Sequence, residues 1–229
     1  GHSKVSFRGL LIMKTIYVVR HGQTYMNLYT KMQGWSDTPL TQKGIDGAKK
    51  LSKELSDIPF DVAITSDLKR ASDTCKIIVD QNINKDNLQI ISTPYFREQF
   101  YGYLEGLDSE MAWRMAGSPH GYQHSKDMFT HEKIDTIRDW CKEADPFKQA
   151  EDSTQYWKRV MKGLTLISNL KEAKTILLVT HGFTIRSIVN KFASDIDVHK
   201  DPRNSSFTKI QLISPTNIKV IAYDKVIAK

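Results

Sequence analysis

Cysteine is scarce in this chain of 229 residues, which holds only Cys75 and Cys141, far apart and without a CxxC pair. A disulfide framework and a zinc ribbon both need more cysteines at closer spacing, so the sequence favours neither. Cys75 follows a helical pattern and reads as a small core residue. Two unpaired thiols suit a reducing compartment, and we expect a cytoplasmic protein.

Long apolar runs are also missing. No stretch approaches the roughly 20 residues that a membrane-spanning helix needs, and "GLLIM" near the start is too short for the core of a signal peptide. We therefore expect neither export nor a membrane partner. Residues 1–12 read as a tag remnant or an N-terminal extension, because "MKTIYVV" from Met13 would itself make a good beginning.

The formal net charge is +7, yet the basic residues form no long block. Lysines are spread over helix-like segments such as "AKKLSKEL" and "YWKRVMKGL", which is typical of a solvated surface. Such a charge also suits an enzyme that attracts phosphorylated metabolites. We expect no nucleic-acid partner.

Short β-rich runs, nearly all apolar, indicate strands buried on both faces of a sheet. They span residues 15–19, 61–65, 88–93 and 175–180. Helical patterns lie between them, at residues 40–55 with Thr41 as the cap and at residues 66–80 with Ser66 as the cap. This alternation predicts a parallel α/β sheet.

The remaining segments complete a single domain over residues 13–229. Residues 206–213 and 217–224 look like two closing strands around the "SPT" turn. Residues 107–152 contain no clear β run, and we interpret them as a helical lid inserted over one end of the sheet. The predicted architecture is a three-layer α/β/α fold with a mostly parallel central sheet.

Polar residues follow three of the predicted strands: Arg20-His21-Gly22, Ser66 to Arg70, and His181-Gly182. Parallel strands place their carboxyl ends at one edge of the sheet, so these residues should meet in one crevice. Two histidines and two arginines held together there would need an anion to offset their charge.

Phosphate is the anion that these residue types fit best. The planar fork of an arginine matches phosphate oxygens, and a helix that starts at Ser66 would direct free backbone N–H groups to the same ligand. Gly22 and Gly182 would let the backbone approach closely. The sequence therefore predicts a phosphate site.

Five motifs occur in an order that resembles the histidine phosphatase, or phosphoglycerate mutase-like, superfamily. They are "RHGQT", "GWSDTPLTQKG", "SDLKRASDT", "EQFYGYLEG" and "THG". The resemblance runs from Met13 nearly to the end of the chain. A lone RHG would be a weak signal, whereas five motifs in order are specific.

The resemblance implies that His21 is the nucleophile, which takes the phosphoryl group as a phosphohistidine. It implies that Arg20, Arg70 and His181 hold the phosphate oxygens, and that Glu98 is the general acid. Glu105 in "YLEG" is the nearby competitor for the acid role, although a structural place is commoner for it in this family.

The resemblance also implies contacts to the substrate. Asn27 matches a phosphate-binding amide, and Gln33-Gly34 falls on the substrate-contacting loop. Tyr101 matches a substrate contact of the mutases, and Gly182 follows the second histidine of the site.

A metal site is the rival use of the histidines. Zinc catalysis needs about three protein ligands at characteristic spacing, and neither HExxH nor a carboxylate set accompanies His21 or His181. His120, His124 and His131 cluster in the insertion, but their surroundings look like an exposed loop. We expect no metal and no cofactor.

Trp113, Trp140 and Trp157 are interpreted as lid and core packing, because they do not interleave with basic residues.

The sequence favours a phosphatase that acts on small phosphorylated metabolites and releases inorganic phosphate. A 2,3-bisphosphoglycerate-dependent mutase would need cations for a second acidic group, and the insertion offers only scattered Arg114 and Arg138. Glu105 also stands where the mutase motif has glutamine. Lys126, Lys133 and Arg138 could still contact an acidic tail, so the mutase remains the alternative.

A non-enzymatic protein that binds polyanions is the second alternative. We would expect such a protein to have lost His21 or Glu98, and both are present. The oligomeric state stays open, with a homodimer as one option.

Overall fold

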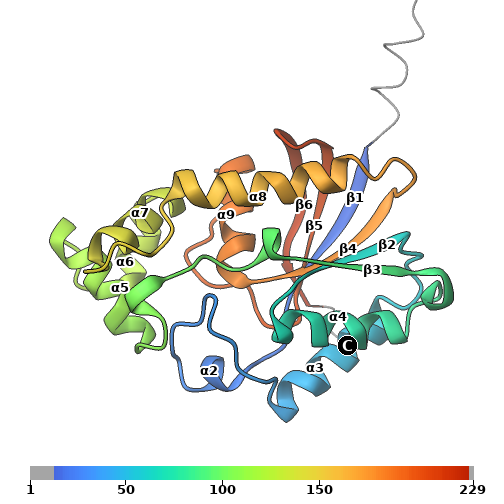
Figure 1. The fold of residues 1–229 in the computed structure, drawn as a ribbon, viewed down its shortest axis with the longest axis horizontal. Helices are drawn as coiled ribbons and strands as arrows, with labels where there is room; N and C mark the ends of the chain where they lie inside the picture. Colours follow the sequence, from blue (N-terminus) through green and yellow to red (C-terminus); the bar gives the residue numbers. More distant parts are fainter. Residues whose placement is uncertain (1–12, 227–229) are drawn as a thin grey trace, which may run out of the picture.

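A six-stranded sheet forms the centre of the protein in the computed structural model, which describes residues 13–226 (Figure 1). The strand order is β3-β2-β4-β1-β5-β6. The bounds are β1 Lys14–Arg20, β2 Val62–Ser66, β3 Gln89–Thr93, β4 Thr175–Thr180, β5 Phe207–Ser214 and β6 Asn217–Lys225. The first four strands in this order pair in parallel, and β5 and β6 add antiparallel pairs. The predicted mixed α/β fold is confirmed.

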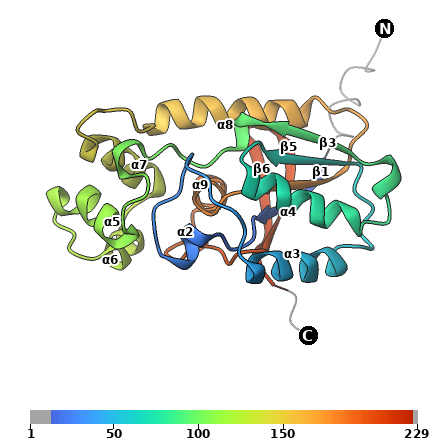
Figure 2. The same cartoon turned by 60° about the horizontal axis from the view of Figure 1, so that its bottom comes forward.

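Helices α3 (Gln42–Glu54) and α4 (Lys69–Asp80) cover one face of the sheet (Figure 2). Thr41 caps α3 as predicted, because its side chain accepts a hydrogen bond from the backbone N–H of Gly44. Apolar side chains of both helices pack on β2 and β4, and buried Cys75 lies among them, as expected of a small core residue.

Helices α8 (Ser153–Ser168) and α9 (Gly182–Phe192) pack against the other face, where the larger part of the core lies. Helix α8 begins with a capping box, in which Asp152 accepts from the backbone of Gln155 and the Gln155 side chain accepts from Asp152. Helix α9 follows β4 directly, so it starts at the carboxyl end of the parallel strands.

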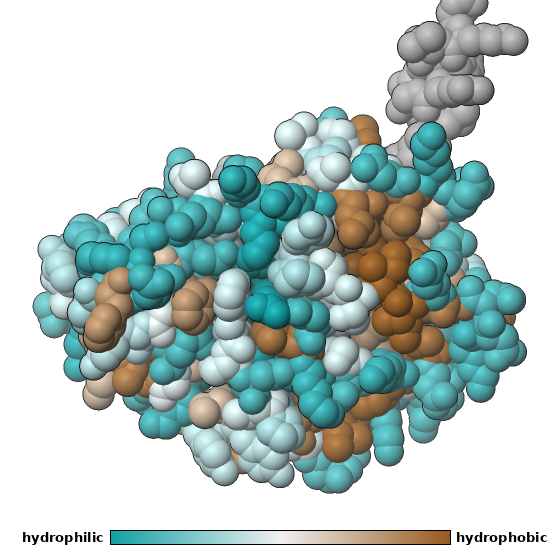
Figure 3. All heavy atoms as spheres, in the orientation of Figure 1, coloured by the Kyte–Doolittle hydropathy of each residue, from teal (hydrophilic) through white to brown (hydrophobic). Residues whose placement is uncertain are grey.

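Strand β3 departs from the prediction of strands buried on both faces. It is an edge strand that pairs only with β2, and four of its five residues are exposed or half-buried. Ile90 is 38% exposed. Figure 3 shows an apolar area on the side of the molecule where β3 lies in Figure 1. A short apolar run does not reveal whether its strand will have one neighbour or two.

Residues 107–152 are helical, as expected, with α5 (Ser109–Gly117), α6 (Ser125–His131) and α7 (Ile134–Ala144). These helices pack on one another and lie together beyond one end of the sheet (Figures 1 and 2). Their position over that end agrees with a lid, although a covering function stays a prediction.

The remaining elements are short. They are α2 (Tyr25–Leu28) and the 3₁₀ turns η1 (Lys85–Asn87), η2 (Pro94–Phe96), η3 (Gly102–Leu104) and η4 (Ser118–His120). Within residues 13–226, no helix has the length and apolar character to cross a membrane. The predicted tag remnant or extension at residues 1–12 lies outside the described residues.

Candidate functional site

The two histidines and Arg70 meet at the carboxyl ends of β1, β2 and β4. The Nε of Arg70 donates to Nε2 of His21 at 3.3 Å, and the rings of His21 and His181 have centroids 5.2 Å apart. All three side chains are nearly inaccessible, with exposed fractions of 3% for His21, 1% for Arg70 and 0% for His181. The sequence therefore predicts their proximity correctly, because parallel strands bring these positions to one edge.

His21 is held in one tautomer by its own backbone. Its Nδ1 lies 2.7 Å from the carbonyl oxygen of Gly22, and a carbonyl can only accept, so Nδ1 carries the proton. The lone pair of Nε2 then faces Arg70. Burial, together with the charges of Arg70 and Arg20, holds the pKa of His21 well below 6.5. The imidazole is thus neutral and its Nε2 is an electron-pair donor.

His181 is oriented by Ser66, whose hydroxyl oxygen lies 2.8 Å from Nε2. The same oxygen accepts from the backbone N–H of Leu68, and it keeps a second lone pair as well as its proton, so this contact does not fix the tautomer of His181. Nδ1 of His181 is buried without a hydrogen-bond partner among the described residues. Burial and the charge of Arg70 lower the pKa of His181.

The prediction that Ser66 caps a helix is wrong. Helix α4 begins at Lys69, its N-cap is Leu68, and Ser66 is the last residue of β2. The backbone N–H groups of Lys69 and Arg70 donate to the carboxylate of Asp37 at 2.5 and 3.4 Å. An internal carboxylate therefore occupies the helix start that the sequence assigned to a phosphate.

Arg70 is bound into the loop that precedes α3. Its Nη1 donates to the carbonyl of Ser36 at 2.7 Å and to Asp37 at 3.0 Å, and its Nη2 donates to the carbonyl of Gly34 at 2.6 Å. Burial lowers the pKa of this guanidinium, and the charge of Asp37 opposes the shift. The loop fixes Arg70 with its Nε toward His21.

Arg20 lies against the start of α9. A Cβ atom at position 182 would lie 3.0 Å from the Arg20 Nε, so glycine leaves room for this close approach. The Nε is buried and has no hydrogen-bond partner in the described part of the chain, while Nη1 donates to the carbonyl of Pro202. A Cβ atom at position 22 would meet the Gly44 carbonyl oxygen at 2.6 Å, so glycine there allows a close approach to α3, and its approach to a ligand stays a prediction.

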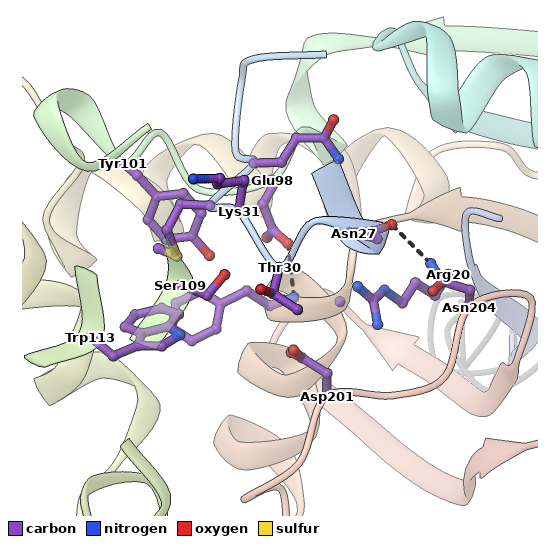
Figure 4. Close-up of a pocket in the computed structure, with 14 residues that line it drawn as sticks. Arg20, Asn27, Thr30, Lys31, Glu98, Tyr101, Ser109, Trp113, Asp201 and Asn204 are labelled. Atoms are coloured by element: carbon purple, nitrogen blue, oxygen red, sulfur yellow. Dashed lines mark hydrogen bonds between the residues drawn. The ribbon is translucent and has the colours of Figure 1, made fainter. Parts of the chain in front are cut away.

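A cavity of about 330 Å³ opens beside Arg20 (Figure 4). Predicted site residues that line it are Arg20, Asn27, Gln33, Glu98, Tyr101 and Gly182. His21, Arg70 and His181 are not part of the lining. A ligand that reaches His21 Nε2 would have to displace the Nε of Arg70 from it.

Glu98 is 5% exposed and follows η2 at the edge of this cavity. Its Oε2 accepts from the backbone N–H of Phe183 at 2.9 Å, and its Oε1 accepts from the Thr184 hydroxyl at 3.0 Å. Burial raises its pKa above 4.5, although these hydrogen bonds oppose the shift. The Glu98 carbonyl accepts from Trp35 Nε1 at 2.9 Å and from Arg159 Nη2 at 3.1 Å, which fixes the backbone.

Glu105 holds the loop around residues 34–36 instead of lining the cavity. Its carboxylate accepts from the backbone N–H groups of Gly34, Trp35 and Ser36 at 3.0, 3.2 and 3.0 Å, and from Tyr101 at 2.9 Å. Glu105 therefore has a structural role, which was the alternative to its acting as the general acid. Its identity gives no evidence about a second phosphate, so that argument against a mutase fails.

The residues predicted to contact the substrate differ in whether they line the cavity. Asn27 lines the cavity, with its Oδ1 accepting from Asn204 Nδ2 at 3.2 Å. Gln33 borders the cavity, but its amide is bonded to Thr24 and Thr38. Gly34 is absent from the lining and supports Arg70 through its carbonyl.

The aromatic side of the cavity is formed by Tyr101 and Trp113, whose rings meet edge to face at 5.8 Å. Burial raises the pKa of Tyr101 well above its ordinary value, so its hydroxyl stays protonated. Trp157 packs in the core, as expected, and Trp140 stacks on His120 with centroids 4.0 Å apart.

The cations proposed from the insertion do not reach the cavity. Arg114, Lys126, Lys133 and Arg138 are all absent from its lining. Arg138 is buried, pairs with Asp135 at 2.7 Å and lies 3.7 Å over the ring of Tyr156. An arginine in a polar, helical sequence looks available, and only its packing shows that it is part of the core.

The lining residues that sequence reasoning did not assign to the site include Lys31, Ser109, Asp201 and Asn204. Lys31 stands two positions before Gln33, so its closeness to the expected substrate loop was the available signal. Asp201 and Asn204 belong to the segment between α9 and β5, which carries no motif.

The structure also bears on the rival metal site. Among residues 13–226, no group of three or more histidines, cysteines, aspartates or glutamates is placed to hold a metal ion. His120 pairs with Glu143 at 3.0 Å, and His131 bonds the carbonyl of Asp127 at 2.8 Å. These histidines have local partners.

Known proteins that are similar to this chain include mutases and phosphatases. A 2,3-bisphosphoglycerate-dependent phosphoglycerate mutase of Allorhizobium ampelinum is 34% identical over 179 residues, which cover 76% of this chain and 77% of the relative. The crystal structure of a phosphoglycerate mutase from Bacillus anthracis superimposes with a TM-score of 0.86 at 28% identity, covering 95% of both chains. The α-ribazole phosphatase from Shigella flexneri gives a TM-score of 0.67 at 21% identity, covering 92% of this chain and 96% of its own, which supports the fold alone.

The names of these relatives support the mutase alternative better than the favoured phosphatase. The family itself does not depend on that choice. A model of the histidine phosphatase superfamily (branch 1) matches residues 16–224, nearly all of the part of the chain that the structure describes. The resemblance found in the five motifs is confirmed, and the chain belongs to the histidine phosphatase superfamily.

Proposed function

We propose that this protein transfers the phosphoryl group of a small phosphate monoester to His21 and then to water. The observation that carries the proposal is the neutral, buried imidazole of His21, with its proton on Nδ1 and its Nε2 lone pair beside Arg70. A neutral imidazole nitrogen is the form that can attack phosphorus.

In the first step, Nε2 of His21 forms a bond to phosphorus as the bond from phosphorus to the ester oxygen breaks. The leaving oxygen takes a proton from Glu98, whose raised pKa favours the protonated acid. Arg70 turns its Nε from His21 to a phosphate oxygen, and the unpartnered Arg20 Nε donates to another. His181 is proposed to donate from its unpartnered Nδ1, in the tautomer that carries the proton there. These donors stabilise the charge on the transferring group without a metal.

In the second step, Glu98 takes a proton from a water molecule as the water oxygen bonds to phosphorus. The bond from phosphorus to His21 breaks, and its electron pair returns to Nε2. Inorganic phosphate leaves, and both side chains regain their starting protonation. The same residues therefore complete a hydrolytic cycle.

Water is proposed as the acceptor of the phosphoryl group because the cavity beside Arg20 has few cations. Beyond Arg20, Lys31 is the one basic residue in its lining within the described chain, and the arginines of the insertion are elsewhere. A mutase must hold a bisphosphate, so it needs a second strongly basic subsite. The insertion at residues 107–152 is proposed to act as a lid over the substrate. The two buried free cysteines suit the proposed cytoplasmic location.

A 2,3-bisphosphoglycerate-dependent phosphoglycerate mutase is the second candidate. Relatives that are 28–34% identical over about three quarters of this chain carry that name. In this case 2,3-bisphosphoglycerate would charge His21, and a second substrate would take the phosphoryl group in place of water.

Turnover of p-nitrophenyl phosphate in the presence of EDTA tests the hydrolase. We expect metal-independent release of phosphate, an intermediate with an acid-labile and alkali-stable phosphoryl group, and loss of both in His21→Ala. The matched control is His131→Ala, which changes an exposed histidine and should retain full activity. Appreciable turnover by folded His21→Ala would refute the covalent mechanism.

A separate assay decides between the acceptors. The protein is given 3-phosphoglycerate with 2,3-bisphosphoglycerate, and 2-phosphoglycerate and free phosphate are followed together. Phosphate without 2-phosphoglycerate supports the hydrolase, and rapid formation of 2-phosphoglycerate supports the mutase. No turnover in either assay, with salt-sensitive DNA binding, would support the polyanion-binding alternative.

A further inference from the structure

The cavity is lined by an acidic side chain, which has the same charge sign as the phosphate that the site is proposed to bind. Asp201 comes from the segment between α9 and β5, and its carboxylate is directed into the cavity (Figure 4). The side chain is 58% exposed, so it faces the open volume. A carboxylate in an anion-binding cavity disfavours anions near it, and this cost calls for an explanation.

Asp201 is fixed in place by a buried arginine. Its Oδ1 accepts from Nη1 of Arg186 at 2.9 Å, and Arg186 is 3% exposed. Arg186 is itself held by the carbonyls of Val198 and His199, at 2.9 and 3.0 Å. Within residues 13–226, Oδ2 of Asp201 has no hydrogen-bond donor, so one oxygen is anchored and the other is free for a ligand.

The cavity lining carries two cations, Arg20 and Lys31, and two carboxylates, Glu98 and Asp201. Because Arg20 and Glu98 are assigned to phosphate transfer, Lys31 and Asp201 are the charged groups left for the leaving alcohol. Lys31 comes from the loop after α2, and the hydroxyl-bearing residues Thr30 and Ser109 lie in the same lining. A leaving group with two negative charges would be attracted by Lys31 and repelled by Asp201. A leaving group that carries a carboxylate and an ammonium would satisfy both side chains.

We propose that Asp201 is a specificity-determining residue that binds an ammonium group on the leaving alcohol, while Lys31 binds a carboxylate. The preferred substrates are then phosphate esters of amino acids that carry a hydroxyl group in the side chain, and O-phospho-L-serine is the simplest of them. This inference rests on the proposed function, because it assumes that the phosphate occupies the inner site at His21.

Two phosphate esters of nearly the same shape provide a matched test of the role of Asp201. O-phospho-L-serine and 3-phosphoglycerate share the phosphate, the three carbons and the carboxylate, and they differ in an ammonium or a hydroxyl at C2. We expect kcat/KM to be about tenfold higher for O-phospho-L-serine, since hydrogen bonds to charged groups are the stronger ones. Asp201→Asn should reduce this preference to near unity by lowering kcat/KM for O-phospho-L-serine.

Two further variants separate recognition from folding. Lys31→Met should weaken both esters alike, because both carry the carboxylate. Asp197→Asn removes a 70% exposed acid from the same segment and should leave the preference unchanged. The melting temperature of Asp201→Asn shows whether that variant is folded. Asp201→Glu keeps the negative charge, so it should retain part of the preference for O-phospho-L-serine.

Calorimetry on the His21→Ala variant measures the affinity of both esters without turnover. Equal affinities, or a preference that Asp201→Asn does not change, would overturn the role of Asp201. Failure of the proposed function looks different, because then no phosphate ester is hydrolysed by the wild-type protein while the binding preference can still be measured.

Discussion

The carboxylate of Glu98 is anchored to Phe183, whose backbone N–H donates to Oε2 at 2.9 Å. Phe183 stands two positions after His181, so the helix that starts behind the second histidine also holds the proposed acid. Because Thr184 bonds the other oxygen, one turn of α9 fixes the distance between His181 and the proposed proton donor. The acid therefore belongs to the rigid sheet edge, although it follows β3 by five residues in sequence.

Glu98→Gln tests the acid with little change of shape. The amide can still accept from Phe183, but it cannot supply a proton to a leaving alkoxide. We expect kcat for an alkyl phosphate to fall by about 100-fold, and kcat for p-nitrophenyl phosphate by less than about tenfold, because a good leaving group needs less help. Steady-state kinetics on both substrates, with Glu110→Gln as the exposed control, provide the measurement. Equal losses on the two substrates would contradict the acid role.

The pH dependence of kcat/KM should be bell-shaped with an acidic optimum. The first step needs His21 without a proton and Glu98 with one. Burial and two arginines lower the pKa of His21 below 6.5, so activity should persist as the pH falls beneath that value. Burial raises the pKa of Glu98 above 4.5, and activity should decline as the pH rises through that raised value.

The variant Glu98→Gln separates the two limbs of the profile. It should lose the alkaline decline and keep the acidic one, because His21 still titrates. A profile of the variant with both limbs intact would mean that another group, and not Glu98, supplies the proton.

Sequence reasoning located the inner site because its signals are local. Apolar runs mark the strands, and parallel pairing alone brings His21, Arg70 and His181 to one edge. The same local reasoning misassigned Ser66, since a serine between a strand and a helix is a good cap by composition. Only the packing of β4 against β2 shows that its hydroxyl is used by His181.

The contributions of Lys31 and Asp201 to the cavity could not be predicted, because these two residues come from segments without regular patterns. Lys31 and Asp201 are 170 positions apart, and their common cavity depends on how two loops pack. Arg138 shows the converse error. Its helix is polar in sequence, but the guanidinium is buried against Tyr156 and Ser187, so a cation expected to meet substrate is a core residue.

Glu105→Gln tests the clamp on the loop that supports Arg70. A glutamine replaces one accepting oxygen by an NH₂ group, which would face backbone donors of residues 34–36. We expect the free energy of unfolding to fall by roughly 1–3 kcal/mol, because buried donors lose their acceptor. Denaturant unfolding measures this loss. Since Glu105 does not line the cavity, the ratio of kcat/KM between two substrates should stay constant, and a switch toward mutase activity would contradict its structural role.

Arg70→Lys tests whether the guanidinium works as a fork. Arg70 bonds the Ser36 and Gly34 carbonyls, Asp37 and His21 at once, and a single ammonium cannot reach all four. The variant should lose at least about 2 kcal/mol of stability, because buried acceptors are left without donors. Inorganic phosphate should raise the melting temperature of the wild-type protein more than that of the variant, since binding to the folded state alone stabilises it. Arg114→Lys, an exposed change, should show the wild-type response in both measurements. An equal phosphate response in Arg70→Lys would place the anion elsewhere, because a ligand bound at His21 must contact the guanidinium that now occupies its Nε2.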